Sequence, residues 1–334
     1  MNKKISLITG CAGFIGSHMT DYLLKKKHLV YGIDNLTSGK IENLNNAKKN
    51  KNFIFIKGNI SKVLTSKGIK KKIKKIDYVF HFAGNGELIP SIEKPLEYFE
   101  NNSFNTVKLL EFINKNYKIK KFLYAASSSC YGVVNGKTEE KNKINTEHPY
   151  AFSKYIGELA CLHWAKVYKI PLISIRIFNA YGPRSRTTNV YGAVIGVFLK
   201  QKLSNYPLTI VGDGKQKRDF LYISDLCNAF YLASKSKINN ETFNLGSGKS
   251  KSVYYLSSLI SKNIKFIPWR PGEPKFIEAN ISKITNELKW KPKISLKDGI
   301  QNILKEINYW KNAPLWTTSK IKKATSNWMK FLKD

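Results

Sequence analysis

Short apolar runs alternate with amphipathic segments over the first half of the chain. The runs predict strands that end at Gly10 and at Asp34, and further strands at residues 52–60, 77–84, 120–129 and 172–178. Apolar positions at helical spacing predict helices that begin near Phe14 and that cover residues 61–73, 95–116 and 150–168. Strands separated by helices of this length need right-handed crossovers. The sequence therefore predicts an α/β fold with a doubly wound parallel sheet.

This pattern loosens after Asn179, where glycine-rich turns separate short apolar segments. We expect a smaller, mixed α/β domain there, which would cover a ligand on the sheet domain. The predicted division assigns 1–178 and a returning segment near 219–247 to the sheet domain, and 179–218 and 248–334 to the second domain.

The first predicted turn carries glycines at three-residue spacing, Gly10, Gly13 and Gly16. Such a turn lets the backbone approach a pyrophosphate at the N-terminus of the following helix. Asp34 ends the next predicted strand, where a carboxylate can bind a ribose diol and repel a 2'-phosphate. The unit predicts a Rossmann-type domain that binds NAD in preference to NADP.

The net charge of +34 raises the question of a nucleic-acid or membrane partner. The lysines are spread along the chain among many Asn and Ile residues, which is typical of a solvated basic surface. Arginine is rare, and its planar fork suits phosphate or carboxylate. The five arginines are Arg176, Arg184, Arg186, Arg218 and Arg270.

We expect a cytoplasmic protein without stable membrane insertion. No apolar run approaches the length of a membrane span, and polar residues soon follow the apolar N-terminal stretch. The four cysteines lack metal-ligand spacing, which favours reduced thiols and no metal site; they are Cys11, Cys130, Cys161 and Cys227.

Residues 317–332 follow a helical pattern in which one face carries Ile321, Thr325, Trp328 and Leu332 and the rest is rich in lysine. A basic amphipathic helix can lie on an anionic membrane. We expect instead that this face packs on the protein's own surface or on a second subunit.

Tyr150 and Lys154 lie four positions apart in a predicted helix, so their side chains share one face. An ammonium beside a phenol favours the phenolate and is expected to lower its pKa, as a general base requires. A serine cluster, Ser127 to Ser129, ends the preceding strand at the edge where open α/β sheets bind ligands. These residues predict a catalytic site.

The spacing G-x-x-G-x-x-G resembles that of the short-chain dehydrogenase/reductase superfamily, and YGIDNLTSG resembles its extended branch, which acts on sugar nucleotides. The segments YAASSSCYG, HFAG, RIFNAYGPR, GDGKQKRDFLYISD and RPGEP also resemble family motifs and extend the resemblance over nearly the whole chain. The resemblance implies that Ser127, Tyr150 and Lys154 are catalytic.

The same resemblance implies two sets of binding residues. The cofactor set is Gly10, Gly13, Phe14, Ile15, Gly16, Asp34, Asn35, Asn59, Ile60, Phe82, Ala83, Gly84, Asn101, Tyr150, Lys154 and Phe178. The substrate set is Glu87, Ser127, Ser128, Ser129, Asn179, Val194, Arg218, Arg270, Glu273 and Ile277. Arg218 and Arg270 are expected to hold the nucleotide diphosphate, whereas Arg176 is expected to be structural.

Members of this family oxidise carbon 4 of a sugar, and the branches differ in the later steps of the reaction. The 4,6-dehydratases carry Asp-Glu after the catalytic hydroxyl, where this chain has Ser128 and Ser129, so dehydration is disfavoured. Residues 189–198 resemble the nucleotide-binding segment of UDP-N-acetylglucosamine-type 4-epimerases. The predicted function is 4-epimerisation of a UDP-hexose or UDP-N-acetylhexosamine, in the synthesis of cell-surface polysaccharide precursors.

Several alternatives stay open at the level of sequence. A decarboxylase or uronate epimerase would need a cationic partner, for which Arg186 is a candidate, and a 4-oxidase shares the same first step. Ile277, of intermediate size, occupies the gating position of the 4-epimerases, and Glu87 is an unusual carboxylate. Asn59 replaces the family's adenine-binding aspartate, and its amide oxygen can accept the same hydrogen bond.

The resemblance also implies a homodimer. A non-catalytic NAD sensor or RNA-binding protein would usually lack Tyr150 or Lys154.

Overall fold

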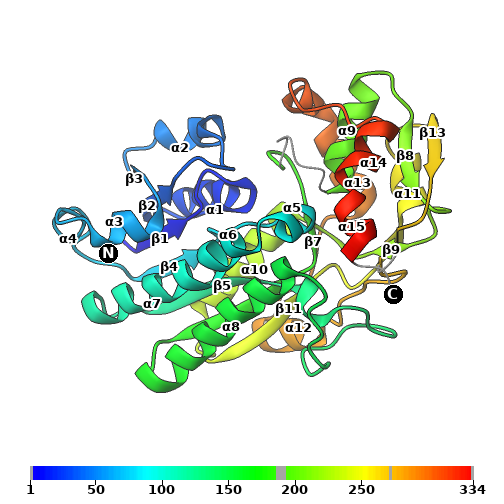
Figure 1. Cartoon of the computed structure of the whole chain (residues 1–334). Helices are drawn as coiled ribbons and strands as arrows, with labels where there is room; N and C mark the ends of the chain where they lie inside the picture. The colour runs from blue at the N-terminus through cyan, green and yellow to red at the C-terminus, as the bar shows by residue number, and fades with distance from the viewer. Residues whose placement is uncertain (1–2, 186–192, 271–272, 332–334) are drawn as a thin grey trace.

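The computed structural model describes residues 3–185, 193–270 and 273–331. Seven parallel strands form one sheet in the order β11-β6-β5-β4-β1-β2-β3 (Figure 1). The strands are β1 (Ile5–Thr9), β2 (Leu29–Asp34), β3 (Phe53–Lys57), β4 (Tyr78–His81), β5 (Lys121–Ser127), β6 (Leu172–Ile177) and β11 (Glu241–Leu245). The strand order reverses between β1 and β4, so the sheet is doubly wound, as predicted. Ligands of such sheets bind at the carboxyl ends of the strands near this reversal.

Helices cover both faces of the sheet. On one face lie α1 (Phe14–Lys25) and α10 (Ile223–Lys235), and on the other α3 (Ile60–Thr65), α7 (Asn105–Asn116) and α8 (Pro149–Tyr168). Neighbouring strand residues point to opposite faces, so Ile8 belongs to the first core and Leu7 to the second. The strands read as continuous apolar runs because both faces are buried.

Two predicted helices are interrupted. The segment 61–73 forms α3 and α4 (Ile69–Lys72), because Ser66 is extended and its hydroxyl donates to the Val63 carbonyl. The segment 95–116 contains α6 (Pro95–Phe99), a π-helical turn η2 (Glu100–Phe104) and α7. The π turn carries the fully buried Asn102, whose role is described below.

The second lobe has its own apolar core. Its elements are α9 (Val194–Leu203), β8 (Leu208–Val211), α11 (Val253–Ser258), β13 (Ile264–Ile267), α13 (Leu296–Lys305) and η4 (Ile307–Trp310). Three strand pairs accompany it: β8 with β13, β7 (Asn179–Tyr181) with β10 (Phe220–Tyr222), and β9 (Lys217–Arg218) with β12 (Lys251–Ser252). Helix α12 (Ser282–Leu288) packs on the core of the sheet lobe, although the division by sequence assigned it to the second domain.

Short helices complete the described chain: η1 (Ile41–Leu44), α2 (Asn45–Lys48), α5 (Leu88–Glu93), η3 (Ser128–Tyr131), α14 (Thr318–Ala324) and α15 (Ser326–Phe331). Helices α14 and α15 replace the single helix predicted over 317–332, with the break at Thr325. The predicted apolar face packs on the protein's own surface, since Ile321, Thr325 and Trp328 are buried; Leu332 lies outside the described residues. No helix in the described ranges is both long and apolar enough to cross a membrane.

Candidate active site

The turn between β1 and α1 is shaped by its glycines. Gly10 has a φ of +71°, in the left-handed region that favours glycine, and a Cβ atom there would lie 2.8 Å from the Ala83 nitrogen. A Cβ atom at Gly16 would overlap the carbonyl oxygen of Gly10. This close packing places the N-terminus of α1 at a cavity of about 570 Å³. Free N–H groups and the helix dipole there fit a pyrophosphate.

Asp34 ties this turn to β2. Its carboxylate accepts hydrogen bonds from the backbone N–H groups of Ala12, at 2.9 Å, and Leu36, at 2.7 Å. The side chain is buried, and burial raises its pKa. Asp34 does not line either of the two cavities of the site. Its expected contact with a ribose stays a prediction.

Asn59 caps α3. Its amide oxygen accepts from the backbone N–H of Ser61 at 3.0 Å and from the Ser61 hydroxyl at 2.8 Å. These two bonds use both lone pairs of that oxygen, so the predicted bond from adenine would have to replace one of them. The other expected cofactor residues that do not line either cavity are Asn35, Ile60, Ala83 and Asn101.

The three predicted catalytic residues come together at the carboxyl edge of the sheet. Ser127 ends β5, while Tyr150 and Lys154 lie on the first two turns of α8. The Tyr150 hydroxyl donates to Ser127 Oγ at 3.1 Å. All three side chains line the same cavity as the glycine turn. This arrangement can move a proton between a ligand hydroxyl and the Tyr150 phenol.

Burial is the main influence on the pKa values of Tyr150 and Lys154. It raises the pKa of Tyr150, although the contact with Ser127 lowers it in part, and it lowers the pKa of Lys154 to about 8. The Lys154 ammonium lies 4.4 Å from the centroid of the Tyr124 ring. The expected lowering of the Tyr150 pKa was therefore wrong for the protein alone, because desolvation outweighs the other influences on the phenol.

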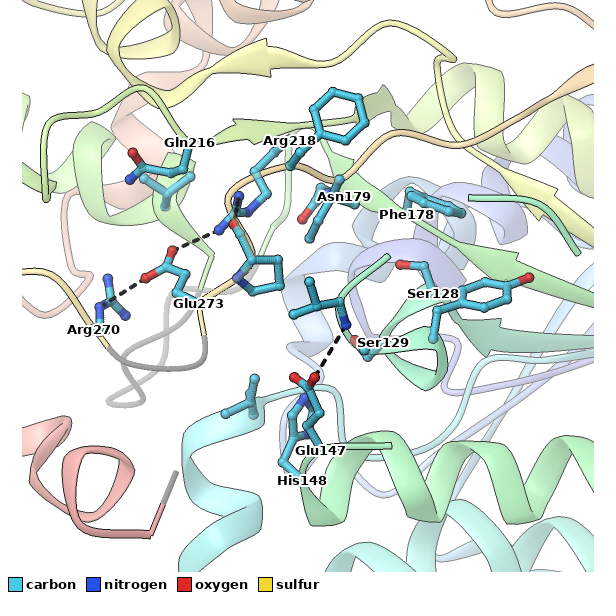
Figure 2. Close-up of a pocket in the computed structure, with 18 of the residues that line it drawn as sticks. Ser128, Ser129, Glu147, His148, Phe178, Asn179, Gln216, Arg218, Arg270 and Glu273 are labelled. Atoms are coloured by element: carbon cyan, nitrogen blue, oxygen red, sulfur yellow. Dashed lines mark hydrogen bonds and ion pairs between the residues drawn. The ribbon is translucent and has the colours of Figure 1, made fainter. Parts of the chain in front are cut away.

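A second cavity, of about 630 Å³, shares part of its lining with the first. Figure 2 shows side chains that line this second cavity. Glu273 forms ion pairs with Arg218 at 2.9 Å and with Arg270 at 3.4 Å. Arg218 also donates to the Pro274 carbonyl at 2.7 Å. Burial lowers the pKa of Arg218, and Glu273 opposes that shift. Two cations held at the wall of one cavity provide a site for a diphosphate.

The two cavities share part of their lining. The first is lined by Gly10, Gly13, Phe14, Ile15, Gly16, Phe82, Gly84, Glu87, Ser127, Tyr150 and Lys154 among the predicted residues. The second is lined by Val194, Arg218, Glu273 and Ile277. Both are lined by Ser128, Ser129, Phe178, Asn179 and Arg270. A ligand that spans the shared wall would lie against both the catalytic group and the arginines.

The remaining arginines have different surroundings. Arg176 is structural, as expected: its guanidinium binds Glu158 at 2.7 Å and the Tyr131 hydroxyl at 2.6 Å. Arg184 lines the first cavity and pairs with Asp21 at 2.8 Å. Arg186 lies outside the described residues, as does part of the segment 189–198.

Some residues of the site were not predicted. His148 caps α8, accepting from the Ala151 N–H at 3.2 Å, and its ring stacks on Tyr150 with the centroids 5.8 Å apart. Burial lowers the pKa of His148 to about 4, so the ring is neutral at pH 7. Asn102 accepts from the Asn85 N–H at 2.7 Å and donates to the Ser153 hydroxyl at 3.0 Å. It thereby joins the loop before Glu87 to the catalytic helix.

Sequence signals for these residues were weak. His148 precedes Pro149 at the start of a helix, which is a recognisable capping position. Asn102 acts through a buried contact between distant segments, which no local pattern marks. Trp328 belonged to a predicted apolar face, but nothing in the sequence placed that face at the site.

The family model described as GDP-mannose 4,6 dehydratase matches residues 7–303 of the chain. The chain belongs to the extended short-chain dehydrogenase/reductase family of sugar-nucleotide epimerases and dehydratases. This short-chain dehydrogenase/reductase is 36% identical over 314 residues to a protein of Bacillus subtilis named as an uncharacterized UDP-glucose epimerase, YtcB, with 89% of this chain and 95% of the relative covered.

Two solved structures resemble this short-chain dehydrogenase/reductase closely. One is the UDP-glucuronic acid 4-epimerase of Bacillus cereus in complex with UDP-glucuronic acid and NAD, with a TM-score of 0.83, 34% identity, and 92% of this chain and 99% of that chain covered. The other is a UDP-N-acetylglucosamine 4-epimerase of Methanobrevibacter ruminantium in complex with UDP-N-acetylmuramic acid, with a TM-score of 0.83, 33% identity, and 92% and 100% covered. The predicted fold class and family are thus confirmed.

Proposed function

We propose that this protein epimerises a UDP-hexose or UDP-N-acetylhexosamine at carbon 4, with NAD as its cofactor. The observation that carries the proposal is the Tyr150–Ser127 hydrogen bond of 3.1 Å, in a cavity that contains the glycine turn and adjoins the arginines. The two similar structures, of 4-epimerases with UDP-sugars, support the same function.

Ser127 and Tyr150 act on the sugar hydroxyl at carbon 4. Ser127 Oγ accepts or donates a hydrogen bond at that oxygen, while the Tyr150 phenolate takes its proton. NAD, when bound in the cavity beside the glycine turn, would supply the hydride acceptor and donor for this chemistry. Lys154, which lines the same cavity and is charged below a pH of about 8, would favour the phenolate through its charge and would hold the cofactor.

The cavity near Arg218 and Arg270 holds the nucleotide while the sugar turns. Both guanidiniums can donate charge-assisted hydrogen bonds to a diphosphate, and Glu273 keeps them in place. The keto sugar must rotate between the two hydride transfers, so the cavity at the shared wall has to be larger than the sugar. The catalytic group lies in the first cavity, of about 570 Å³, which reaches this shared wall.

Dehydration is the alternative that the described residues support less well. A 4,6-dehydratase needs an acid next to the catalytic hydroxyl, and the residues there are Ser128 and Ser129. Glu87 and Glu147 line the cavities, but Glu147 accepts a hydrogen bond from the Val133 N–H at 3.3 Å. A dehydratase would release a 4-keto-6-deoxy sugar nucleotide, which NMR distinguishes from an epimer.

The test is incubation of the purified protein with single UDP-sugars, followed by proton NMR of the anomeric signals. We expect UDP-glucose and UDP-galactose, or their N-acetylated counterparts, to interconvert without net NADH formation. A uronate epimerase or decarboxylase would act only on a UDP-uronate, and a 4-oxidase would accumulate NADH. RNA binding at physiological salt that survives Tyr150→Phe, without turnover of any UDP-sugar, would contradict the proposal in favour of a non-catalytic role.

We further propose that the protein forms a homodimer through α8. The outer side of this helix carries Phe152, Leu159 and Val167, which are 44%, 42% and 50% exposed. Leu96 on α6 and Phe104 on η2 are 83% and 64% exposed. Exposed apolar side chains at helical spacing on one long helix favour burial against a second copy.

A further inference from the structure

The C-terminal segment lies beyond the family match, yet it reaches the site. The match ends at residue 303, and α14 and α15 follow it. Ile321 and Trp328 share an apolar cluster with Ile89 of α5, Val211 of β8 and Ile267 of β13. The segment thus packs on both lobes, and Asn327 donates to Glu93 of α5 at 3.1 Å. Figure 1 shows α15 between α5 and the second lobe.

Trp328 lies where the two cavities meet. It lines both of them, together with Leu88 at the start of α5 and five residues already assigned to the site. Its side chain is 8% exposed, and the Arg270 guanidinium carbon lies 5.9 Å from the centroid of its ring. Arg270 also pairs with Glu273 at 3.4 Å. Arg270 therefore lies close to both the indole and the Glu273 carboxylate.

We propose that Trp328 is a positioning residue for the substrate diphosphate. This inference rests on the proposed function, because it takes Arg270 as a diphosphate ligand. An arginine side chain has many rotamers, and fixing it before the ligand arrives removes that entropy cost from binding. The face of an aromatic ring attracts a guanidinium through its charge and does not itself take up an N–H donor.

The position of Trp328 also affects how much water reaches the site. The residues that line both cavities lie between the arginines and the catalytic group. A sugar linked to a diphosphate on the arginines has to extend past these residues to reach Tyr150. The buried Trp328 indole among these residues reduces the contact of water with the ion pairs of Glu273. Ion pairs that are shielded from water are stronger.

The experiment measures UDP binding to the NAD-loaded, full-length protein by isothermal titration calorimetry. Trp328→Leu keeps an apolar side chain but removes the ring, whereas Trp328→Phe keeps a ring. We expect Trp328→Leu to weaken UDP binding about three- to tenfold and Trp328→Phe to stay within about twofold of the wild type. With a UDP-sugar, KM should rise by the same factor as the UDP dissociation constant, while kcat stays within about twofold.

A double-mutant cycle separates positioning from general damage. In Arg270→Ala the indole has no guanidinium to hold, so adding Trp328→Leu should weaken UDP binding no further. Asn327→Ala is the matched control, because it removes a contact of α15 with α5 that does not line a cavity. It should leave UDP affinity unchanged, and NAD affinity should be unchanged in all the Trp328 variants.

The outcomes distinguish the two proposals. Unchanged UDP affinity in Trp328→Leu, effects that add fully with Arg270→Ala, or an equal loss in Asn327→Ala would each overturn the role of Trp328 alone. Absence of UDP binding by the wild-type, NAD-loaded protein would overturn the proposed function and this inference with it.

Discussion

Tyr150 and Lys154 share one helix face, but burial moves their pKa values in opposite directions, upward for the phenol and downward for the ammonium. Ser127 Oγ lies 3.1 Å from the phenol oxygen of Tyr150 and accepts its hydrogen bond. The neutral ring of His148 stacks on Tyr150 and adds no charge. At the scale of single residues, the site depends on how a few polar groups are held in a desolvated pocket.

Tyr150→Phe should lower kcat for the UDP-sugar by about 10²- to 10⁴-fold, since it removes the group that exchanges a proton with the substrate. NAD binding should persist, because the ring and its stacking on His148 remain. Initial rates by NMR and calorimetric titration with NAD measure the two effects. Tyr155→Phe, on the same helix and outside both cavities, is the matched control. Equal turnover by Tyr150→Phe would refute the assignment of the base.

Lys154→Met should stabilise the protein at pH 7 while abolishing most turnover. Burial lowers the folded-state pKa of Lys154 from 10.5 to about 8, so keeping it protonated costs up to about 3 kcal/mol below pH 8. Between pH 8 and 10.5 the unfolded state binds more protons than the folded state, and wild-type stability rises with pH relative to the variant.

Urea unfolding at pH 7 and pH 9.5 measures this difference. The stability advantage of Lys154→Met should shrink at the higher pH. Lys166→Met, at an exposed position of the same helix, controls for the loss of a lysine from α8. A stability difference that does not change with pH would contradict a buried, charged Lys154.

At the scale of the elements, the ends of strands and helices position the catalytic residues and the glycine turn. The glycine turn connects β1 to α1, β5 ends at Ser127, and α8 begins just before Tyr150. Because the strands are parallel, these ends meet at one edge of the sheet. The predicted helix 95–116 is interrupted by a π turn that carries Asn102, whose buried side chain bonds to Ser153 of the catalytic helix.

Gly16→Ala should abolish NAD binding and destabilise the fold by about 1 to 3 kcal/mol, since the added methyl group overlaps the Gly10 carbonyl oxygen and forces α1 away from the turn. Fluorescence titration with NAD and thermal unfolding measure the two effects. Gly68→Ala is the control, because a Cβ atom there meets no atom within 4 Å and Gly68 lines neither cavity. If Gly16→Ala binds NAD normally, the close approach of α1 to the turn is not needed.

The two lobes meet along the cavities, and several segments cross between them. The returning segment that holds α10 and β11 joins the sheet, and α15 reaches back to α5. The chain has a net charge of +34, while the outer side of α8 presents apolar side chains. At the scale of the whole molecule, that side of α8 is the surface expected to meet a second copy.

Leu159→Glu should convert the proposed dimer to a monomer, because it would bury two like charges at the proposed interface. Sedimentation velocity over a range of protein concentrations measures the change. Phe266→Glu alters a side chain of β13 that is 51% exposed and should leave the mass unchanged. A wild-type protein that sediments as a monomer at every concentration would exclude this interface.

The sequence by itself determined the alternation of strands and helices, the glycine turn and the shared face of Tyr150 and Lys154. These features depend on neighbouring residues, whose spacing sets backbone conformation and side-chain direction. They were enough to predict the fold class and to single out Tyr150 and Lys154, whereas the catalytic role of Ser127 came from the family resemblance.

Only the tertiary structure decided the direction of the Tyr150 pKa shift and the place of Trp328 against Arg270. Both depend on which distant segments exclude water from a side chain or touch it. Desolvation and cation–aromatic contact act through space, and the local spacing of residues carries no measure of either.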